Sequence, residues 1–349
     1  MTTIASKQKT TSFSPWLIAC AVLVVVGLAA WIVQLTQGFD VLGVSQTVSW
    51  GVYIAAFFLL AGAGSGLIIL AAAADLGWLA ALQGQRRMLL TAAIGCFVAA
   101  GVMILMDIGK PERVINMILS PNFGSMFVWD FYALALSVVL ALVYLYLGPM
   151  GKWLPWAAAI VAAAVVIVEG WILSSSAATV MWHSALVPVI FLLEGLVTAL
   201  ALIVLANGKA AVGRLLAGLL VAVLALTLIE LFTLTNAGEP EQVAGVGLLL
   251  GGSLAVYYWG QLLLGLAVPF VLLVWAGKNR SAVMAAAVLA ILGVFVAKMV
   301  LLVAGQAQPF MGAQAGYMPS LVELAGVVGV LGLAGLVYLL ANRWMPSKA

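Results

Sequence analysis

Ten long apolar runs constrain the fold of this chain more than any other feature of its sequence. A helix needs about 20 apolar residues to cross the ~30 Å hydrocarbon layer of a membrane. The predicted helices are Pro15–Gln37, Val48–Ala74, Met88–Met106, Phe127–Leu147, Leu154–Ser176, Ser184–Ala206, Ala211–Thr235, Val246–Trp275, Ser281–Gly305 and Ser320–Leu340. The loops between them are short, so neighbouring helices should be antiparallel. Only 7% of the residues are charged, against about 25% in a soluble domain. The sequence therefore predicts an all-α polytopic membrane protein, with residues 1–349 forming a single integral membrane domain.

Lysine and arginine predict the side of the membrane that each loop faces, because they accumulate in cytoplasmic loops. With a cytoplasmic N-terminus, eleven of the fourteen fall on the cytoplasmic side: Lys7, Lys9, Arg86, Arg87, Lys152, Lys209, Arg214, Lys278, Arg280, Arg343 and Lys348. Only Lys110 and Arg113 fall outside, and Lys298 lies within a predicted helix. We therefore expect both termini in the cytoplasm. The first apolar run should remain as a helix, because no small-residue cleavage site follows it.

Cysteine and histidine are too few for a metal cofactor inside this chain. Cys20 and Cys96 are the two cysteines, whereas an iron–sulfur cluster needs about four thiolates. His183 is the single histidine, so a haem held by two histidines is excluded. We expect no haem, no iron–sulfur cluster and no metal site. The net charge of +3 does not indicate nucleic-acid binding, because the basic residues lie at helix ends rather than in a patch.

Ionisable residues within the predicted helices or at their ends gather toward the outer side of the membrane. They are Asp107, Asp130, Glu169, His183, Glu230, Lys298 and Glu323. Only Glu194 approaches the middle. Ionisable groups inside a membrane are costly and usually functional, whereas a transporter or channel should carry them at mid-depth or along a path through the membrane. The pattern favours an outer site that opens to lipid and binds a lipid-soluble molecule with a polar head. A quinol is the best candidate, because carboxylates and an imidazole can accept its protons.

The segment MDIGKPERVINMILSPNFGSMFVWD, residues 106–130, contains five of the 25 charged residues of the chain. They are Asp107, Lys110, Glu112, Arg113 and Asp130. An outside loop is expected to contain few lysines and arginines, but this segment contains two, which suggests a role other than setting the topology. We expect a short amphipathic helix over Pro111–Leu119.

Three stretches of the sequence carry motifs. The second predicted helix contains SWGVYIAAFFLLAGAGSGLIIL, residues 49–70, with a Trp/Tyr start and a glycine-rich centre. A D-x-G-x-P-x-R loop is formed by Asp107, Gly109, Pro111 and Arg113, and the chain re-enters the membrane with Pro121, Asn122, Ser125 and Trp129. The stretch EGWILSSSAATVMWHSALVPVIFLLEGLVTAL, residues 169–200, contains the motif residues Gly170, Leu173, Ser174, Trp182, Pro188 and Phe191.

Together these stretches resemble the NrfD/PsrC family, the membrane subunits of polysulfide-reductase-type respiratory complexes. The segment GYMPSLVELAGVVG, residues 316–329, is similar to the longer, ten-helix members. The resemblance covers most of residues 48–340. It implies two four-helix bundles plus flanking helices, with the first bundle within 15–176 and the second within 184–340. It also implies a bacterial or archaeal cytoplasmic membrane.

The resemblance implies that the protein exchanges electrons between the membrane quinone pool, menaquinone or ubiquinone, and an extracytoplasmic iron–sulfur subunit. Menaquinol oxidation is the favoured direction, and a molybdopterin or other catalytic partner would complete the complex. The iron–sulfur subunit would dock near Lys110, Glu112 and Arg113. At two quinone contacts this chain departs from the family. An apolar position near Phe57 replaces a histidine, and Val168, beside Glu169, replaces a tyrosine.

Candidate roles follow for twelve residues. Asp107, Asp130, Glu169 and His183 are candidate proton acceptors or quinol contacts, and Glu194 and Glu230 could relay protons. The candidates for the wall of the quinone pocket are Trp50, Tyr53, Gly62, Gly66, Trp129 and Trp182.

Simpler roles are open for several of these residues. Trp50 and Tyr53 could be interfacial anchors, and the glycines could allow close helix packing. Lys298 is expected to pair with Glu323. The alternative functions are a secondary transporter or ion-translocating subunit and a passive membrane anchor for a catalytic partner.

Overall fold

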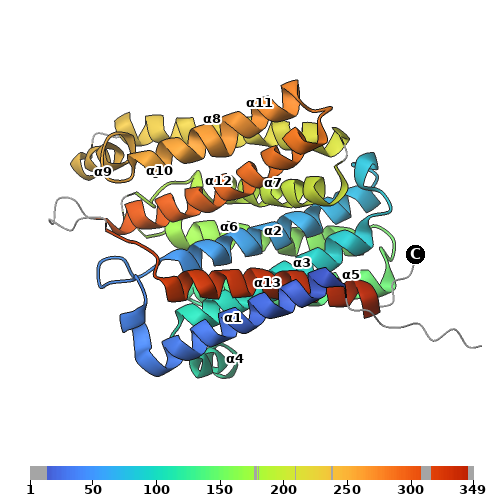
Figure 1. Ribbon diagram of the computed structural model, residues 1–349, viewed down its shortest axis with the longest axis horizontal. Coiled ribbons are helices and arrows are strands. Elements are labelled where there is room, and N and C mark those ends of the chain that lie inside the picture. The colour runs from blue at the N-terminus through green and yellow to red at the C-terminus, as the bar shows by residue number, and fades with distance from the viewer. Residues whose placement is uncertain are drawn as a thin grey trace, which may run out of the picture.

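The computed structural model describes residues 14–176, 179, 181–208, 210–236, 239–307 and 316–344. In these ranges the chain is helical and contains no strand, and ten helices are long and apolar enough to cross a membrane. They are α1 (Pro15–Gln37), α2 (Val52–Asp75), α3 (Arg86–Asp107), α5 (Met126–Leu147), α6 (Trp153–Ser174), α7 (Val187–Asn207), α8 (Ala210–Asn236), the continuous span of α10 to α11 (Ala255–Trp275), α12 (Arg280–Gln306) and α13 (Leu321–Trp344). The prediction of an all-α polytopic membrane protein is confirmed (Figure 1).

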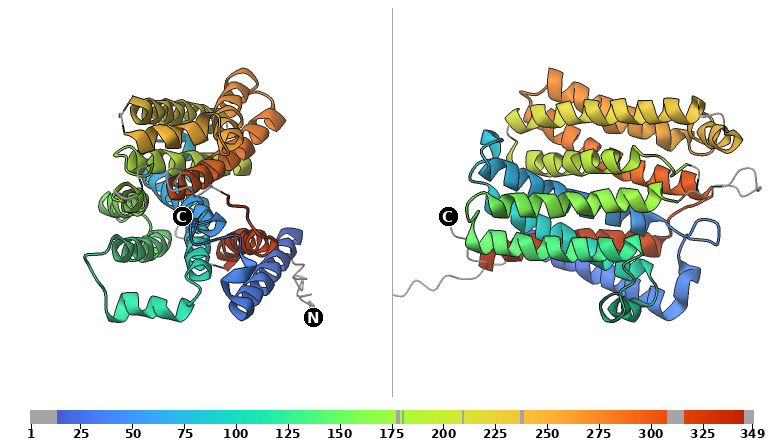
Figure 2. Two further views of the ribbon diagram at one scale, coloured as in Figure 1. Left: turned by 90° about the vertical axis from the view of Figure 1, so that its left-hand side faces the viewer. Right: turned by 180° about the vertical axis from the view of Figure 1, so that it is seen from behind.

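Shorter helices lie in the connections. They are η1 (Gly38–Val41), η2 (Ala80–Leu82), η3 (Pro111–Ile115), α4 (Asn116–Leu119) and α9 (Pro240–Leu250). The segments η3 and α4 together occupy the range predicted for a short amphipathic helix. In the end-on view of Figure 2 this segment lies at the edge of the molecule and runs crosswise to the spanning helices.

The eighth predicted helix, Val246–Trp275, was wrong as one continuous helix. The structure divides it into α9 and the span Ala255–Trp275, with turns over residues 251–254 between them. Gly251 and Gly252 lie at this break. Glycine is a poor helix former, so two in succession favour a turn. The span itself contains α10 (Ala255–Gly260), a π-helical segment η4 (Gln261–Ala267) and α11 (Val268–Trp275).

The spanning helices form two four-helix groups that meet at α2 and α7. Helices α2, α3, α5 and α6 pack around one another, and α7, α8, α12 and the span of α10 to α11 form the second group. Helix α1 packs on α13, which packs on α3. We refer to the two groups as the first and second bundles. Helix α2 is the central element, buried along almost its whole length, which explains why it carries no charge before Asp75.

Small residues bring the two bundles into close contact. An added Cβ at Gly62 would lie 3.3 Å from Gly195 Cα, and one at Gly66 would lie 2.5 Å from Gly195 O. Helix–helix association in membranes relies on such small residues, because water provides no hydrophobic driving force there. In this structure Gly62 and Gly66 therefore join α2 to α7.

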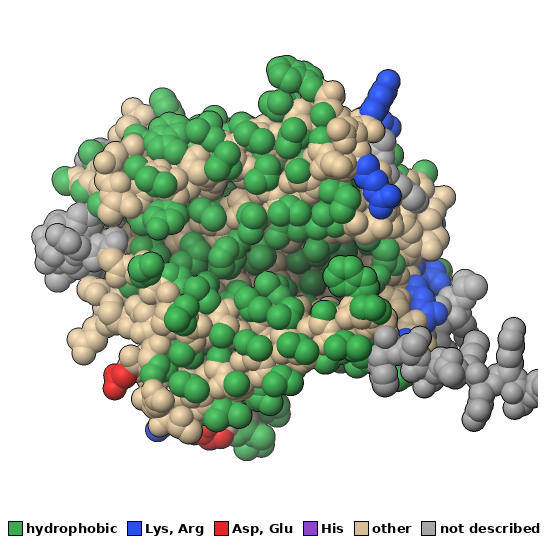
Figure 3. Space-filling model, viewed as in Figure 1, with side chains coloured by type: hydrophobic (Ala, Val, Ile, Leu, Met, Phe, Trp, Pro, Cys, Tyr) green, Lys and Arg blue, Asp and Glu red, His purple; other side chains and the backbone are tan. Residues whose placement is uncertain are grey.

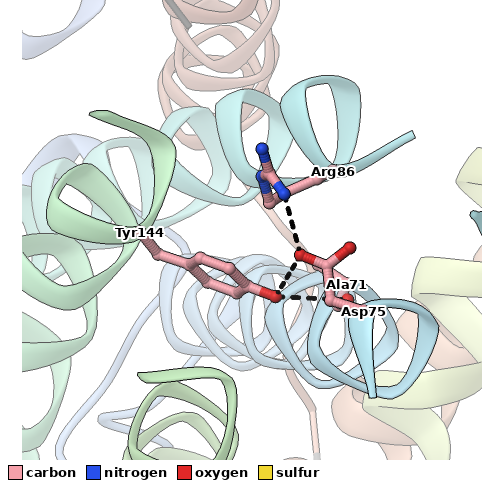
Figure 4. A network of polar contacts seen from close by, with 4 residues as sticks. All are labelled: Ala71, Asp75, Arg86 and Tyr144. Carbon is pink, nitrogen blue, oxygen red and sulfur yellow. Dashed lines mark hydrogen bonds and ion pairs between the residues drawn. The ribbon is translucent and has the colours of Figure 1, made fainter. Parts of the chain in front are cut away.

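Basic residues mark one end of the molecule. Figure 3 shows apolar side chains over the visible face and lysine and arginine at its right-hand edge. At this basic end, Arg86 at the start of α3 lies 3.1 Å from Asp75 Oδ2 at the end of α2. The Tyr144 hydroxyl of α5 donates to the same oxygen at 2.8 Å, so three helices of the first bundle are joined there (Figure 4). Of the candidate site residues, Gly62 and Gly66 lie near the middle of α2, whereas Asp107 and Asp130 lie at or near the opposite ends of α3 and α5.

Candidate functional site

An apolar cavity opens in the first bundle toward the end opposite the basic residues. Its volume is about 340 Å³, and it lies between α2, α3, α5 and the η3–α4 segment. Asp130 is the one ionisable residue among those that line it. The aspartate is 8% exposed, and its Oδ1 has no hydrogen-bond partner within the described residues. A buried carboxylate without a partner is unfavourable in an apolar site, so this atom indicates a ligand or a proton.

The η3–α4 segment covers one side of this cavity. Val114 and Met117 line the cavity, and the Tyr132 hydroxyl donates to the Met117 carbonyl at 3.1 Å. Ile115, Ile118 and Leu119 are exposed on the outside of the segment. Apolar side chains thus lie both toward the cavity and on the exposed side of the segment, rather than on one face alone. Its charged residues Lys110, Glu112 and Arg113 are all in contact with solvent.

Aromatic rings form a wall beside the cavity. Trp50 stacks on Trp182 with ring centroids 5.5 Å apart, and Phe127 meets Trp50 edge-on at 6.1 Å. The Trp182 indole donates to the Leu301 carbonyl at 2.7 Å. Gly305 is required beside it, because a Cβ there would overlap the indole. Two of the predicted pocket residues, Trp50 and Trp182, therefore lie together, although they are distant in the sequence.

The amide of Gln306 fixes the start of α2 at this wall. Its Oε1 accepts from the backbone N–H groups of Ser49 and Trp50, each at 2.8 Å. Its Nε2 donates to the Trp50 carbonyl at 2.8 Å. The single side chain thus satisfies three backbone groups at a helix start, where such groups have no helical partner. The sequence offered one signal for Gln306, a polar residue at the end of an apolar run.

A second, more open cavity of about 550 Å³ lies on the other side of the wall. Its lining includes Ser49, Ser125, Ser175 and Gln306, and it is more polar than the first. Phe127 lines both cavities, so they meet at this ring. A polar opening therefore adjoins the apolar cavity at the end of the molecule opposite the basic residues.

Buried charged residues continue from Asp130 into the second bundle. Glu169 on α6 is 0% exposed, and neither carboxyl oxygen has a hydrogen-bond partner in the described ranges. It interacts electrostatically with Asp130 and with Lys298. Lys298 forms an ion pair with Glu194, with Nζ 2.6 Å from Oε2. The structure therefore brings Asp130, Glu169 and Glu194 into one layer.

The predicted pair of Lys298 with Glu323 was wrong. Glu323 instead accepts hydrogen bonds from the backbone N–H groups of Gly43 and Ser320, each at 2.7 Å, and from the Tyr317 hydroxyl at 2.8 Å. Helix α12 packs against α7, whereas α13 packs against α1 and α3. Two helices that follow each other in the sequence thus turn their charged residues toward different neighbours. Burial raises the pKa of Tyr317 above its usual value, so the phenol remains a donor.

Asp107 and Tyr53 belong to a different cluster from Asp130. The Tyr53 hydroxyl donates to Gln34 Oε1 at 3.2 Å, and Gln34 Nε2 donates to the Met106 carbonyl at 2.7 Å. Asp107 interacts electrostatically with Tyr53 and Glu323. This cluster joins α1, α2, α3 and α13. Neither Asp107 nor Tyr53 lines the apolar cavity.

The other predicted residues lie apart from the cavity. The Trp129 indole donates to the Phe123 carbonyl at 2.9 Å on an exposed face. His183 Nδ1 lies 2.7 Å from the Ser174 carbonyl and joins the ends of α6 and α7. Among the described residues, no three His, Cys, Asp or Glu side chains converge to hold a metal ion. Sequence reasoning missed Phe127 as a ring shared by the two cavities, because aromatic residues recur throughout the chain.

Comparisons with known proteins agree with this architecture. The chain is 28% identical to a putative dimethyl sulfoxide reductase membrane subunit of Halobacterium salinarum, and the match covers 95% of this chain and 91% of that protein. Residues 40–310 match the model of the family described as "Polysulphide reductase, NrfD". The matched range includes both bundles and the apolar cavity. This chain therefore belongs to the NrfD family.

Proposed function

We propose that this protein is the membrane subunit of a respiratory oxidoreductase and exchanges electrons between the quinone pool and an iron–sulfur subunit. The quinone head group would occupy the apolar cavity beside Asp130. The observation that carries the proposal is the cavity itself, in which Asp130, a buried residue whose Oδ1 has no hydrogen-bond partner, is the one ionisable group among the described lining residues. The ten-helix fold and the family membership agree with it.

The residues of the cavity fit a quinone. Phe57, Val98 and Phe131 provide apolar surface for the quinone ring. The apolar cavity lies between membrane-spanning helices, so an isoprenoid tail that leaves it would be in contact with lipid. A quinone bound there would supply two-electron redox chemistry. Asp130 Oδ1 would accept a proton from a quinol hydroxyl, and the surrounding apolar side chains would exclude water from that transfer.

Electrons would leave at the aromatic wall. Trp50, Trp182 and Phe127 line the polar opening, and Phe127 also lines the apolar cavity. An iron–sulfur subunit seated on that opening would therefore lie close to the quinone head. The exposed residues Lys110, Glu112 and Arg113, which follow the end of α3 at Asp107, are a candidate docking surface. The name of the Halobacterium relative supports a complex with a separate catalytic partner, which we propose contains molybdopterin. We favour menaquinol oxidation as the direction.

A quinol titration of the assembled complex tests this function. Asp130→Asn keeps the size of the side chain and removes its base, and Ser137→Ala, a buried residue on the same helix, is the matched control. We expect saturable binding of a short-chain menaquinol to the wild type. Iron–sulfur reduction should slow by at least about a hundredfold in Asp130→Asn and remain unchanged in Ser137→Ala. Absence of quinol binding in a fully assembled wild-type complex would refute the proposal.

A further inference from the structure

We propose that protons released at Asp130 leave through the second bundle, along Glu169, the Lys298–Glu194 pair and Glu230, and not through the polar opening used by electrons. This inference rests on the proposed function, because it needs a quinol at Asp130. It assigns a role to four charged side chains that the quinone cavity itself does not use. The path begins in the first bundle, crosses α6 and ends in a separate cavity of the second bundle.

The first step of this path is Glu169. Its carboxyl group is completely buried and has no hydrogen-bond partner within the described residues. Its helix α6 packs against α5, which carries Asp130, and against α7, which carries Glu194. A purely structural carboxylate at this depth would be expected to have fixed partners. A carboxyl group without them can take a proton on one oxygen and release it from the other.

The second step is the ion pair of Lys298 and Glu194. The two side chains are 3% and 6% exposed, and the ammonium also lies over the Phe191 ring, 2.9 Å from its centroid. Such a pair gains little stability over apolar residues of the same size, because both charges lose their hydration. Its retention inside a membrane span therefore indicates a task. As the proton passes, Lys298 can remain close to whichever carboxylate carries the negative charge.

The third step is a small cavity of about 80 Å³ in the second bundle, whose mainly apolar lining contains several polar side chains. Glu194, Lys298, Glu230, Gln261 and Tyr258 line it. Its volume is sufficient for about two or three water molecules at the density of liquid water. Glu230 Oε1 and Gln261 Oε1 lack hydrogen-bond partners among the residues described, so they can bind such waters. Gln261 is the first residue of the π-helical segment η4, and π-helical turns are frequent at functional sites.

All these groups lie near one end of their helices. Asp130 is four residues after the start of α5, and Glu169 is five residues before the end of α6. Glu230 is six residues before the end of α8, and Lys298 is eight before the end of α12. At a rise of 1.5 Å per residue, each lies within about 12 Å of that end. The path therefore runs parallel to the membrane and returns protons to the side on which the electrons leave.

Protons and electrons are conserved along this path. Oxidation of one quinol breaks two O–H bonds and sends two electrons to oxidised iron–sulfur centres of the partner subunit. Each proton moves in turn to Asp130, Glu169, the Glu194 carboxylate with its neighbouring water, and Glu230. Glu230 then releases it to water. After each passage the side chains return to their starting protonation, so the path consumes no other reactant.

The experiment uses the complete complex with its partner subunits in liposomes, with the docking face outward. Short-chain menaquinol and a pH-sensitive dye in the outer solution would report iron–sulfur reduction and proton release after rapid mixing. The variants are Glu169→Gln, Glu230→Gln and the double variant Lys298→Met with Glu194→Gln, which removes both charges together. Thr198→Val is the matched control, because the Thr198 hydroxyl is buried on α7 and donates to the backbone carbonyl of Glu194, not to a side chain of the path.

We expect the three path variants to bind menaquinol as the wild type does and to release protons at least about tenfold more slowly. Acetic acid, a small permeant proton carrier, should restore much of the rate of proton release. It could not restore this rate if the variants were misfolded. Normal proton release in all three variants, or slow release that acetic acid does not restore, would overturn the path. If Asp130→Asn also behaves as the wild type, the proposed quinol site itself fails.

Discussion

Removal of either charge of the Lys298–Glu194 pair alone should destabilise this protein more than removal of both charges together. The pair is almost fully buried, with side chains 3% and 6% exposed and charged atoms 2.6 Å apart. Lys298→Met alone leaves the Glu194 carboxylate without its counter-ion, and loss of one partner of a buried pair costs about 3–5 kcal/mol. Because the remaining carboxyl group can take up a proton, we expect the lower value, about 3 kcal/mol. Glu194→Gln should cost a similar amount, since it leaves a buried ammonium.

The double variant separates this reasoning from a simple loss of packing. With both charges removed the cost should fall to about 1 kcal/mol, because no isolated buried charge remains. The free energy of unfolding would be measured by titration with a denaturing detergent in mixed micelles, followed by tryptophan fluorescence. Lys278→Met, the same change at an exposed lysine, is the control and should lie within about 0.5 kcal/mol of the wild type. Additive costs of the two single variants in the double variant would refute the reasoning.

Three further predictions concern other parts of the structure. Gly101 lines the apolar cavity with open space beyond its Cα, so Gly101→Leu should fill the cavity and weaken menaquinol binding at least about tenfold. The free energy of unfolding should not change. Normal menaquinol binding by this variant would place the quinone elsewhere. Glu323→Ala should destabilise the protein by about 3 kcal/mol, because a carboxylate that accepts three hydrogen bonds is lost, and amide exchange at Gly43 should accelerate. Gly66→Ala should cost about 1–3 kcal/mol by forcing α2 from α7, whereas Gly218→Ala, with nothing within 4 Å, should be neutral in the same unfolding assay.

Hydropathy was sufficient to predict the spans, because the length of an apolar run is a local property of the chain. Nine of the ten predicted helices are present with boundaries that differ by a few residues. The exception was Val246–Trp275, in which an apolar run continues through the glycine break at residues 251 and 252. Hydropathy does not distinguish a long helix from a short helix and a span joined by an apolar turn.

The candidate site was only partly predictable. The sequence placed Asp130, Glu169 and Glu230 toward one end of the helices by counting residues, and the structure brings Asp130 and Glu169 close enough to interact. The sequence could not separate Asp107 from Asp130, although their side chains belong to different clusters. Asp107 ends α3 and Asp130 lies one turn into α5, but Asp107 lies with the α1 and α13 cluster and Asp130 lines the apolar cavity. The direction in which a side chain points depends on the rotation of its helix, which packing determines.

The sequence by itself determined the membrane fold, the number of apolar runs and the gathering of basic residues at one end. The tertiary structure decided which charges meet. Lys298 pairs with Glu194, more than a hundred residues earlier in the chain, and not with Glu323 on the next helix. Depth in the membrane follows from position along one helix, whereas partners follow from contacts between helices that are distant in sequence. Only those contacts place an unpaired aspartate in an apolar cavity and continue from it, through Glu169, to the second bundle.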